Sequence, residues 1–242
     1  MKILLSNDDG INSKSLKILA EKLSDKHEVL VVAPKNNRSA VSHSLTVFDE
    51  IRLEKVDLIK NCRAFSIDGT PADCIKFAIL NFKDFNADIV VAGINVGHNL
   101  GADILYSGTV SIGYEACFYG KKTFCFSTLS FDEGDYEGFS EIALNIIDEY
   151  YEKINDKTII NVNFPDLPAK NIKGIKFATL AKIVYEDEYV KTGENSYLIK
   201  SNLTDKIDYG TDLYYTVNGY VSITPLLYDK TDHTLLTELK KI

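Results

Sequence analysis

The sequence lacks the cysteine spacings of a zinc site or a disulfide-linked scaffold. Its four cysteines, Cys62, Cys74, Cys117 and Cys125, stand apart in apolar surroundings and never form a C-x-x-C pair. Zinc sites and disulfide frameworks depend on closely and regularly spaced cysteines. We therefore expect buried, reduced thiols.

Long hydrophobic runs are also missing. No stretch approaches the roughly 20 apolar residues that a membrane-spanning helix needs. The N-terminal run Lys2-Ile3-Leu4-Leu5 is too short for a signal peptide. The sequence therefore predicts a cytoplasmic protein with no membrane partner.

Positive charge is scarce, because 27 Lys and Arg stand against 35 Asp and Glu and give a net charge of −8. Binding to duplex nucleic acid rests on Lys and Arg meeting phosphates, so this balance argues against such a partner. A small phosphorylated ligand held by a metal ion remains compatible with it. The 242 residues, 45 % of them apolar and without repeats, suit one large domain with a substantial core.

Four common catalytic motifs are absent. The first apolar strand is not followed by G-x-G-x-x-G, and no G-x-x-x-x-G-K-[ST], G-x-S-x-G or H-E-x-x-H occurs. These absences argue against dehydrogenases with the dinucleotide fingerprint, P-loop enzymes, common serine hydrolases and zincins.

Apolar strand-like runs alternate with helix-like segments as far as residue 165. We expect strands at residues 2–6, 28–33, 88–92, 122–127 and 158–164, and helices at 15–23, 71–81, 110–119 and 138–153. This alternation predicts an α/β fold with a mostly parallel sheet and helices on both faces.

The regular alternation stops near residue 165. Beyond it come the strand-like pieces "IKFATLA" and "SYLIKSNL" and the Tyr-rich stretch "DLYYTVNGYVSITPL". We therefore divide the chain into an α/β core, residues 1–165, and a β-rich extension, residues 166–242. The extension either covers the site or forms a subunit interface, and the sequence leaves both roles open.

Polar loops follow three of the predicted strands. They are "NDDG" at 7–10, "APKNNRSAVSHSLT" at 33–46 and "GINVGHNLGADILYSGTV" at 93–110. Turn chemistry explains each loop separately, but it does not explain their shared location. In an open parallel sheet the carboxyl ends of the strands meet at one edge, where ligands bind. We expect the three loops to converge there.

The adjacent acids Asp8 and Asp9 are the most informative feature of these loops. Two neighbouring carboxylates repel each other unless a cation or strong donors hold them together. Carboxylates with neutral hydroxyl and amide oxygens suit Mg²⁺, Mn²⁺ or Ca²⁺ rather than zinc. Such an ion activates water and polarises a phosphoryl oxygen. The acid pair therefore predicts a catalytic metal site.

Other residues of these loops have two interpretations each. Ser107 or Thr109 caps the helix that follows, or binds phosphate together with the backbone amides at the helix start. His43 and His98 are ordinary loop histidines or contacts to phosphate, and His43 is also a candidate general acid. Asp73 in "GTPADC" reads first as part of a helix-capping box.

The ordered set of motifs resembles the SurE family (stationary-phase survival proteins) of metal-dependent nucleotidases. The resemblance rests on "ILLSNDDG", "NRSAVSHSLT", "GTPADC", "AGINVGHNLGADILYSGTV", "NVNFP" and "GYVSITPL", which cover essentially the full chain. It implies a Rossmann-like core and a C-terminal extension exchanged between subunits in homodimers or homotetramers. It also implies hydrolysis of nucleoside 5′- and 3′-monophosphates, with some members acting on short polyphosphate.

The resemblance also implies roles for individual residues. One divalent cation per subunit, Mg²⁺ or Mn²⁺, would be held by Asp8, Asp9, Ser39 and Asn95. The substrate phosphate would be bound by Ser107, Gly108 and Thr109, with His43 nearby, and catalysis would rest on Asp8, Asp9, Ser107 and Thr109. The second loop departs from the family pattern, since Ala40 and His43 stand where Gly and Asn are more usual.

Two other hypotheses remain open. A signalling receiver domain also has an acid pair after its first strand. Asp57 is the acid at a suitable distance for its phosphate acceptor, but it stands between Val56 and Leu58 with no polar loop around it. A nucleotide-binding protein without catalysis is the other alternative. Among the 14 tyrosines, Tyr106 is the candidate for stacking on a base, because it adjoins Ser107.

Overall fold

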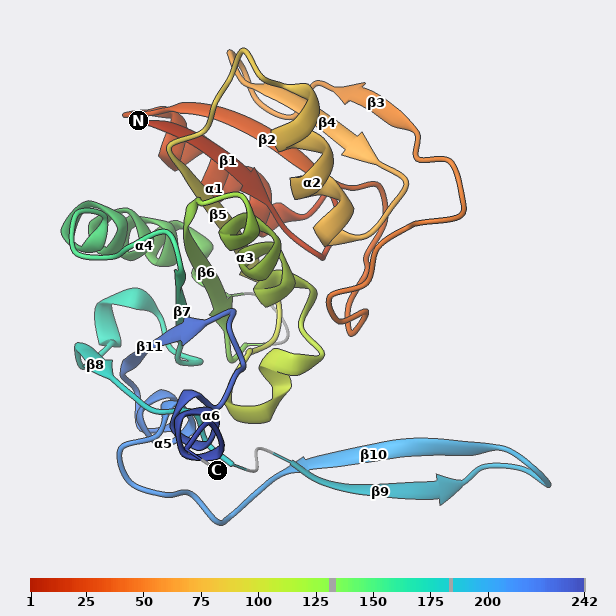
Figure 1. Cartoon of the computed structure of the whole chain (residues 1–242), viewed down its shortest axis with the longest axis vertical. Coiled ribbons are helices and arrows are strands. Elements are labelled where there is room, and N and C mark those ends of the chain that lie inside the picture. The colour runs from red at the N-terminus through yellow and green to blue at the C-terminus, as the bar shows by residue number, and fades with distance from the viewer. Residues whose placement is uncertain (131–133, 183–184, 242) are drawn as a thin grey trace.

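The computed structural model describes residues 1–130, 134–182 and 185–241 (Figure 1). Within them, nine strands form one sheet in the order β3-β4-β2-β1-β5-β6-β7-β11-β8. These strands are β1 (Lys2–Ser6), β2 (Glu28–Pro34), β3 (Leu53–Val56), β4 (Arg63–Ile67), β5 (Ile89–Asn95), β6 (Lys122–Thr128), β7 (Thr158–Phe164), β8 (Ile175–Phe177) and β11 (Val221–Leu227).

The central strands are parallel, as the sequence predicts. β4, β2, β1, β5, β6 and β7 run in the same direction, whereas β3 is antiparallel to β4 and β11 is antiparallel to β7. The α/β fold class with a mostly parallel sheet is therefore confirmed.

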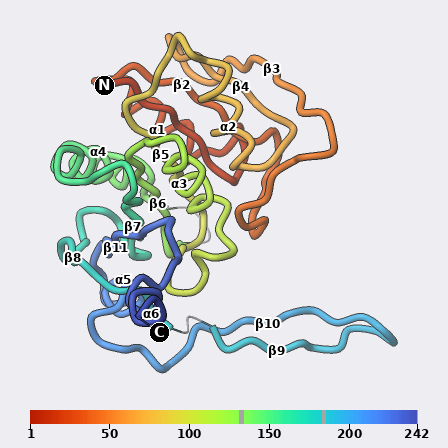
Figure 2. The backbone as a smooth tube through the Cα atoms, viewed as in Figure 1, coloured from red at the N-terminus to blue at the C-terminus, as the bar shows by residue number. Residues whose placement is uncertain are grey.

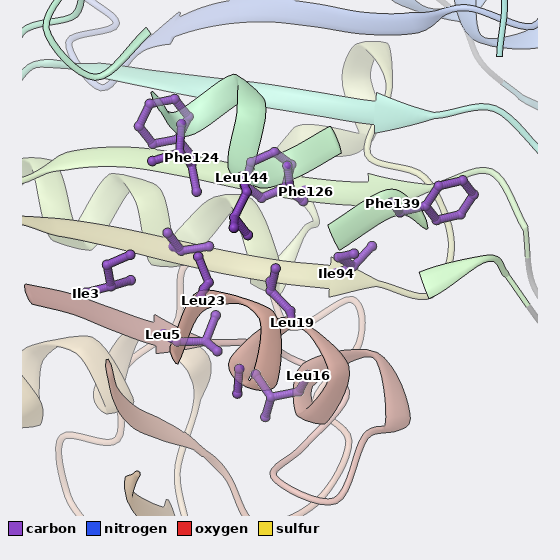
Figure 3. Close-up of a cluster of buried hydrophobic side chains, with 14 of the residues drawn as sticks. Ile3, Leu5, Leu16, Leu19, Leu23, Ile94, Phe124, Phe126, Phe139 and Leu144 are labelled. Carbon is purple, nitrogen blue, oxygen red and sulfur yellow. The ribbon is translucent and has the colours of Figure 1, made fainter. Parts of the chain in front are cut away.

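Helices cover both faces of this sheet. On one face α1 (Lys14–Ser24) and α4 (Tyr136–Tyr150) pack on the strands, and on the other face α2 (Pro71–Asn81) and α3 (Gly108–Phe118) do so. Figure 3 shows the first of these cores, where Leu19 of α1 lies near Leu5 of β1 and Leu144 of α4 lies near Phe126 of β6. Burial on both faces explains why the strands read as continuous apolar runs.

The C-terminal part does not form a separate body of strands. β8 and β11 extend the main sheet beyond β7, while β9 (Tyr185–Lys191) and β10 (Tyr197–Leu203) form a two-stranded antiparallel hairpin. The hairpin projects from the rest of the molecule (Figures 1 and 2). The division at residue 165 stays a prediction.

Several elements differ from the sequence expectation. β3 and β4 were not expected, and residues 212–217 of the Tyr-rich stretch form helix α5 (Asp212–Val217) instead of a strand. The chain further contains α6 (His233–Leu239) and the short 3-10 helices η1 (Gly101–Leu105) and η2 (Ala169–Asn171). Of the helices in the described ranges, none is both long and apolar enough to cross a membrane.

Candidate active site

The strand order reverses at β1, with β2 on one side of it and β5 on the other. Ligands of open α/β sheets bind at such a switch point, at the carboxyl ends of the strands. Asp8 and Asp9 follow β1, and Asn95 ends β5. The predicted convergence of polar loops is therefore found at this edge.

Asp8 lies at the centre of the arrangement and is 3 % exposed. The Thr109 hydroxyl donates a hydrogen bond to Asp8 Oδ1 at 2.5 Å, and the Arg38 backbone N–H donates to the Asp8 carbonyl at 2.7 Å. Helix α3 approaches so closely that a Cβ on Gly108 would lie 2.7 Å from Asp8 Cβ and Oδ2. The helix start and the first acid are therefore in direct contact.

A tight turn presents the acid pair. The Asn7 side chain accepts a hydrogen bond from the Gly10 N–H and donates one to the Gly10 carbonyl, at 3.2 and 3.1 Å. Gly10 has φ +101°, and a Cβ there would lie 3.1 Å from the Asn36 backbone. A glycine is needed because a left-handed conformation and a close backbone approach coincide.

Asp9 connects the ends of three strands. The Val96 backbone N–H donates to Asp9 Oδ2 at 3.1 Å, and the Asn37 side chain donates to Asp9 Oδ1 at 3.4 Å. Asn37 also accepts a hydrogen bond from the Ser39 N–H at 2.9 Å. Asp9 is therefore linked through Asn37 to the exposed Ser39, and through Val96 to the end of β5.

Asn95 is buried beside this pair. Its amide nitrogen donates to the Gly97 carbonyl at 2.7 Å. A cation bound here would therefore meet the amide oxygen. Asp9 is linked to the end of β5 through Val96, the residue after Asn95, and Ser39 follows Arg38, whose N–H donates to the Asp8 carbonyl.

The charges of the acid pair favour a bound cation. Burial, together with the charge of Asp9, raises the pKa of Asp8 to about 6, although the Thr109 hydrogen bond acts against this. Burial also raises the pKa of Asp9. Among the described residues, no group of three or more His, Cys, Asp or Glu side chains could hold a metal. Two carboxylates with neutral oxygens nearby are the kind of donors that a hard divalent ion takes.

The hydroxyls at the start of α3 have protein partners. Ser107 Oγ accepts the Val110 N–H at 2.9 Å, so the N-cap interpretation is confirmed for Ser107, whereas Thr109 donates to Asp8. The helix start still presents backbone N–H groups at the acid pair, and such groups bind anions. The phosphate roles of Ser107, Gly108 and Thr109 stay predictions.

His43 lies away from the acid pair. Its Nε2 is 2.9 Å from Glu115 Oε2, and its ring stacks near Tyr114 and Phe118. Glu115 is a buried acid of α3 and also accepts from Lys76 at 3.0 Å. The contact between Glu115 and His43 was not predicted from the sequence, because 72 residues separate them.

The other singled-out residues have structural partners. His98 is buried, its Nε2 lies 2.8 Å from the Tyr185 hydroxyl, and burial lowers its pKa to about 4. Asp73 accepts from the Thr70 N–H at 2.9 Å in a complete capping box, as predicted. It also accepts from the Thr46 hydroxyl at 2.6 Å and so fastens the loop that carries His43.

Buried amides under the third loop were also missed. The Asn99 N–H donates to the Asn163 side chain at 2.8 Å, and the side chains of Asn161 and Asn163 donate to the Asn99 carbonyl. The two asparagines in "NVNFP" could have indicated this network, because a buried strand with two asparagines needs hydrogen-bond partners for them.

A family model described as "Survival protein SurE" matches residues 3–187. The chain belongs to the SurE family. A SurE protein from Clostridium beijerinckii, named 5′-nucleotidase, is 37 % identical and the match covers 100 % of this chain and 99 % of that one. A 5′-nucleotidase SurE from Clostridium botulinum (strain Alaska E43 / Type E3) is 40 % identical with the same coverage.

The SurE fold is matched as well. The crystal structure of the SurE protein from Aquifex aeolicus has a TM-score of 0.88 and 34 % identity, covering 99 % of this chain and 98 % of that one.

The receiver alternative finds no support in the geometry. Asp57 follows the edge strand β3, which is antiparallel to β4. The C-terminal end of β3 therefore lies at the amino ends of the parallel strands, opposite to the carboxyl ends where Asp8 lies.

Proposed function

We propose that this chain is a metal-dependent nucleotidase that hydrolyses nucleoside 5′- and 3′-monophosphates to nucleoside and phosphate, with short polyphosphate as a further substrate. Family membership and the 5′-nucleotidase names of full-length relatives support the nucleotidase class. The observation that carries the proposal is the direct contact between the buried Asp8 and the first turn of α3.

The residues present fit a resident Mg²⁺ or Mn²⁺. Asp8, Asp9, Asn95 and Ser39 would hold it, the first three from the ends of adjoining strands and Ser39 from the neighbouring loop. When bound, such an ion neutralises phosphate charge and makes a water more acidic.

The chain's own groups have separate tasks in the reaction. The N–H groups at the start of α3, with Ser107 and Thr109 beside them, bind the phosphate oxygens and stabilise the charge that these oxygens carry in the transition state. One carboxylate of the acid pair orients the attacking water in line with the departing ribose oxygen. The water oxygen bonds to phosphorus as the bond from phosphorus to the ribose oxygen breaks. The attacking water gives up a proton and the ribose oxygen takes one, so nucleoside and phosphate leave.

The test is release of inorganic phosphate from a panel of 5′- and 3′-nucleotides and short polyphosphates. Each substrate is measured with EDTA and again after Mg²⁺ or Mn²⁺ is restored. We expect release that disappears with EDTA and returns with metal. Binding of nucleotides without release under any metal would instead favour the non-catalytic nucleotide-binding alternative.

We further propose that the chain assembles as a homodimer or homotetramer. The β9–β10 hairpin, which projects from the main body (Figure 2), supports this. It carries these exposed apolar side chains: Tyr189, Val190, Tyr197, Leu198, Ile199 and Leu203. The cytoplasmic location stays a prediction from the sequence.

A further inference from the structure

A small cavity begins at the start of α3 and is separate from the acid pair. Its volume is about 150 Å³, and its lining includes His43, Ser107, Tyr114, Phe118, Tyr228 and Lys230. Pockets for drug-sized ligands start at about 300 Å³. The cavity therefore suits one ring system rather than a whole nucleotide.

Four lining residues come from one face of α3. Ser107, Ser111, Tyr114 and Phe118 follow each other at spacings of four, three and four residues. With a rise of about 1.5 Å per residue, this face extends about 16 Å from the helix start. A phosphate bound at the helix start would therefore have the cavity beside it, in the direction of the helix axis.

The walls are aromatic and one cation lies at the rim. The rings of His43 and Phe118 are 5.7 Å apart at 23°, and Phe118 meets Tyr228 edge-on at 5.3 Å. Lys230 Nζ lies 5.4 Å from the Tyr114 ring. Phe118 is 58 % exposed, so part of its ring can accept a stacking partner. Aromatic rings next to a cation are the surroundings in which bases stack without sequence-specific hydrogen bonds.

A buried acid fixes the position of His43 in the cavity wall. Glu115 is 2 % exposed and accepts hydrogen bonds from His43 at 2.9 Å and Lys76 at 3.0 Å. Because Glu115 is on α3 and Lys76 on α2, the ring of His43 is fixed relative to both helices. The cavity is therefore a preformed feature of the fold.

We propose that this cavity binds the nucleobase of the substrate by stacking on Phe118, with Tyr228 in edge-on contact, and so makes the enzyme prefer nucleotides over phosphate esters without a base. The inference rests on the proposed nucleotidase function. Stacking on an aromatic face predicts broad tolerance of different bases, because every base has a π-face. Tyr106 adjoins Ser107 but is not among the residues that line this cavity, and the stacking role falls to Phe118 instead.

The test compares kcat/KM for a nucleoside 5′-monophosphate with kcat/KM for ribose 5-phosphate, which lacks the base. Phe118→Ala should lower the ratio of the two values about tenfold, as expected for loss of one base–aromatic contact. Tyr228→Ala should lower it in the same direction. The matched control is Phe177→Ala, because Phe177 is 59 % exposed on β8 and does not line the cavity, and it should leave the ratio unchanged.

The outcomes separate the two proposals. Wild-type protein that releases phosphate from nucleotides, but whose ratio is unchanged in both Phe118→Ala and Tyr228→Ala, retains the nucleotidase function and overturns the base pocket. A wild-type protein with no preference for the nucleotide overturns it too. No release from any nucleotide removes the proposed function itself. Melting temperatures of all variants show that they remain folded.

Discussion

Gly108 is the residue at which helix α3 meets the acid pair. A Cβ at this position would lie 2.7 Å from both Asp8 Cβ and Asp8 Oδ2, and Asp8 is buried and cannot move aside. Gly108→Ala should therefore lower kcat/KM for phosphate release at least about tenfold. Overpacking should lower the free energy of unfolding by about 1–3 kcal/mol.

The control for Gly108→Ala is Gly193→Ala in the hairpin turn. Its nearest neighbour is Ser196 Cβ at 3.4 Å, an ordinary contact. We expect wild-type activity and stability from this variant. Equal activity of the two variants would contradict the close approach as a requirement for catalysis.

Asp8→Asn removes one charge of the acid pair and keeps the side-chain shape. The amide oxygen can still accept the Thr109 hydroxyl, so the fold should stay intact. Burial already disfavours the charged carboxylate, as its raised pKa shows, so the melting temperature should not fall. We expect phosphate release to fall about 100-fold or more. The control is Asp57→Asn, because Asp57 is an exposed acid at the opposite sheet edge. An active Asp8→Asn protein would refute the metal assignment.

Single residues were predictable from the sequence where position along a strand decides their place. Asp8, Asp9 and Asn95 could be brought together because each stands at the carboxyl end of a parallel strand. The partners of His43 could not, because Glu115 and Lys76 are on two different helices. Such pairs depend on how helices pack, which local patterns do not report.

Helix α2 shows how one capped element holds a distant loop. Asp73 accepts hydrogen bonds from the Thr70 N–H, the Thr46 N–H and the Thr46 hydroxyl. Asp73→Ala should lower the free energy of unfolding by about 2–3 kcal/mol, because it removes the acceptor of several half-buried donors at once. Thr70→Ala should cost only about 1 kcal/mol, the usual value of an N-cap. Urea denaturation measures both, and equal costs would show that the Thr46 contacts contribute nothing.

The elements that were missed lack the patterns by which strands are recognised. β3 (Leu53–Val56) is a largely exposed edge strand with the charged residues Glu54 and Lys55 at its centre, and β4 (Arg63–Ile67) is short and starts with Arg63. In α5 the sequence Tyr-Tyr-Thr-Val favours a strand. The Thr211 side chain accepts the Tyr214 N–H, and burial of Leu213 fixes a helix there instead. Tertiary packing overrode local propensity.

At the scale of the whole molecule, the parallel sheet was predictable because both of its faces are covered, which makes strands continuously apolar. The positions of β8 and β11 in the sheet were not predictable. β11 pairs antiparallel with β7 across a long stretch that includes the hairpin, and β8 then adds to β11. Nothing local in "GYVSITPL" distinguishes this pairing from a strand in a separate unit.

Metal binding should stabilise the whole chain, because the ion binds the folded acid pair and not the unfolded chain. At 100 times the dissociation constant, binding adds about 2.7 kcal/mol. For a protein of this size that corresponds to a rise in melting temperature of roughly 5–10 °C. Thermal melts of EDTA-treated protein with and without Mg²⁺ or Mn²⁺ measure this rise. Asp8→Asn should show little of it, and an equal rise in that variant would place the ion elsewhere.

The β9–β10 hairpin is the part of the molecule that most needs a partner. A two-stranded hairpin is marginally stable on its own, and within residues 1–130, 134–182 and 185–241 β9 and β10 pair with each other and with no further strand. Tyr189 is 74 % exposed and Leu198 64 % exposed, so apolar surface stands in water on strands with free edges. A second copy of the chain that packs on the hairpin would bury this surface.

We therefore expect a dimer or tetramer in analytical ultracentrifugation. Leu198→Glu should weaken association by placing a charge in the apolar contact, and the proportion of monomer should rise at low protein concentration. Thr192→Glu, which adds the same charge at the end of the hairpin, is the matched control and should associate as the wild type does. A wild-type chain that sediments as a monomer would contradict the assembly. A Leu198→Glu protein that associates normally would instead place the interface on another surface.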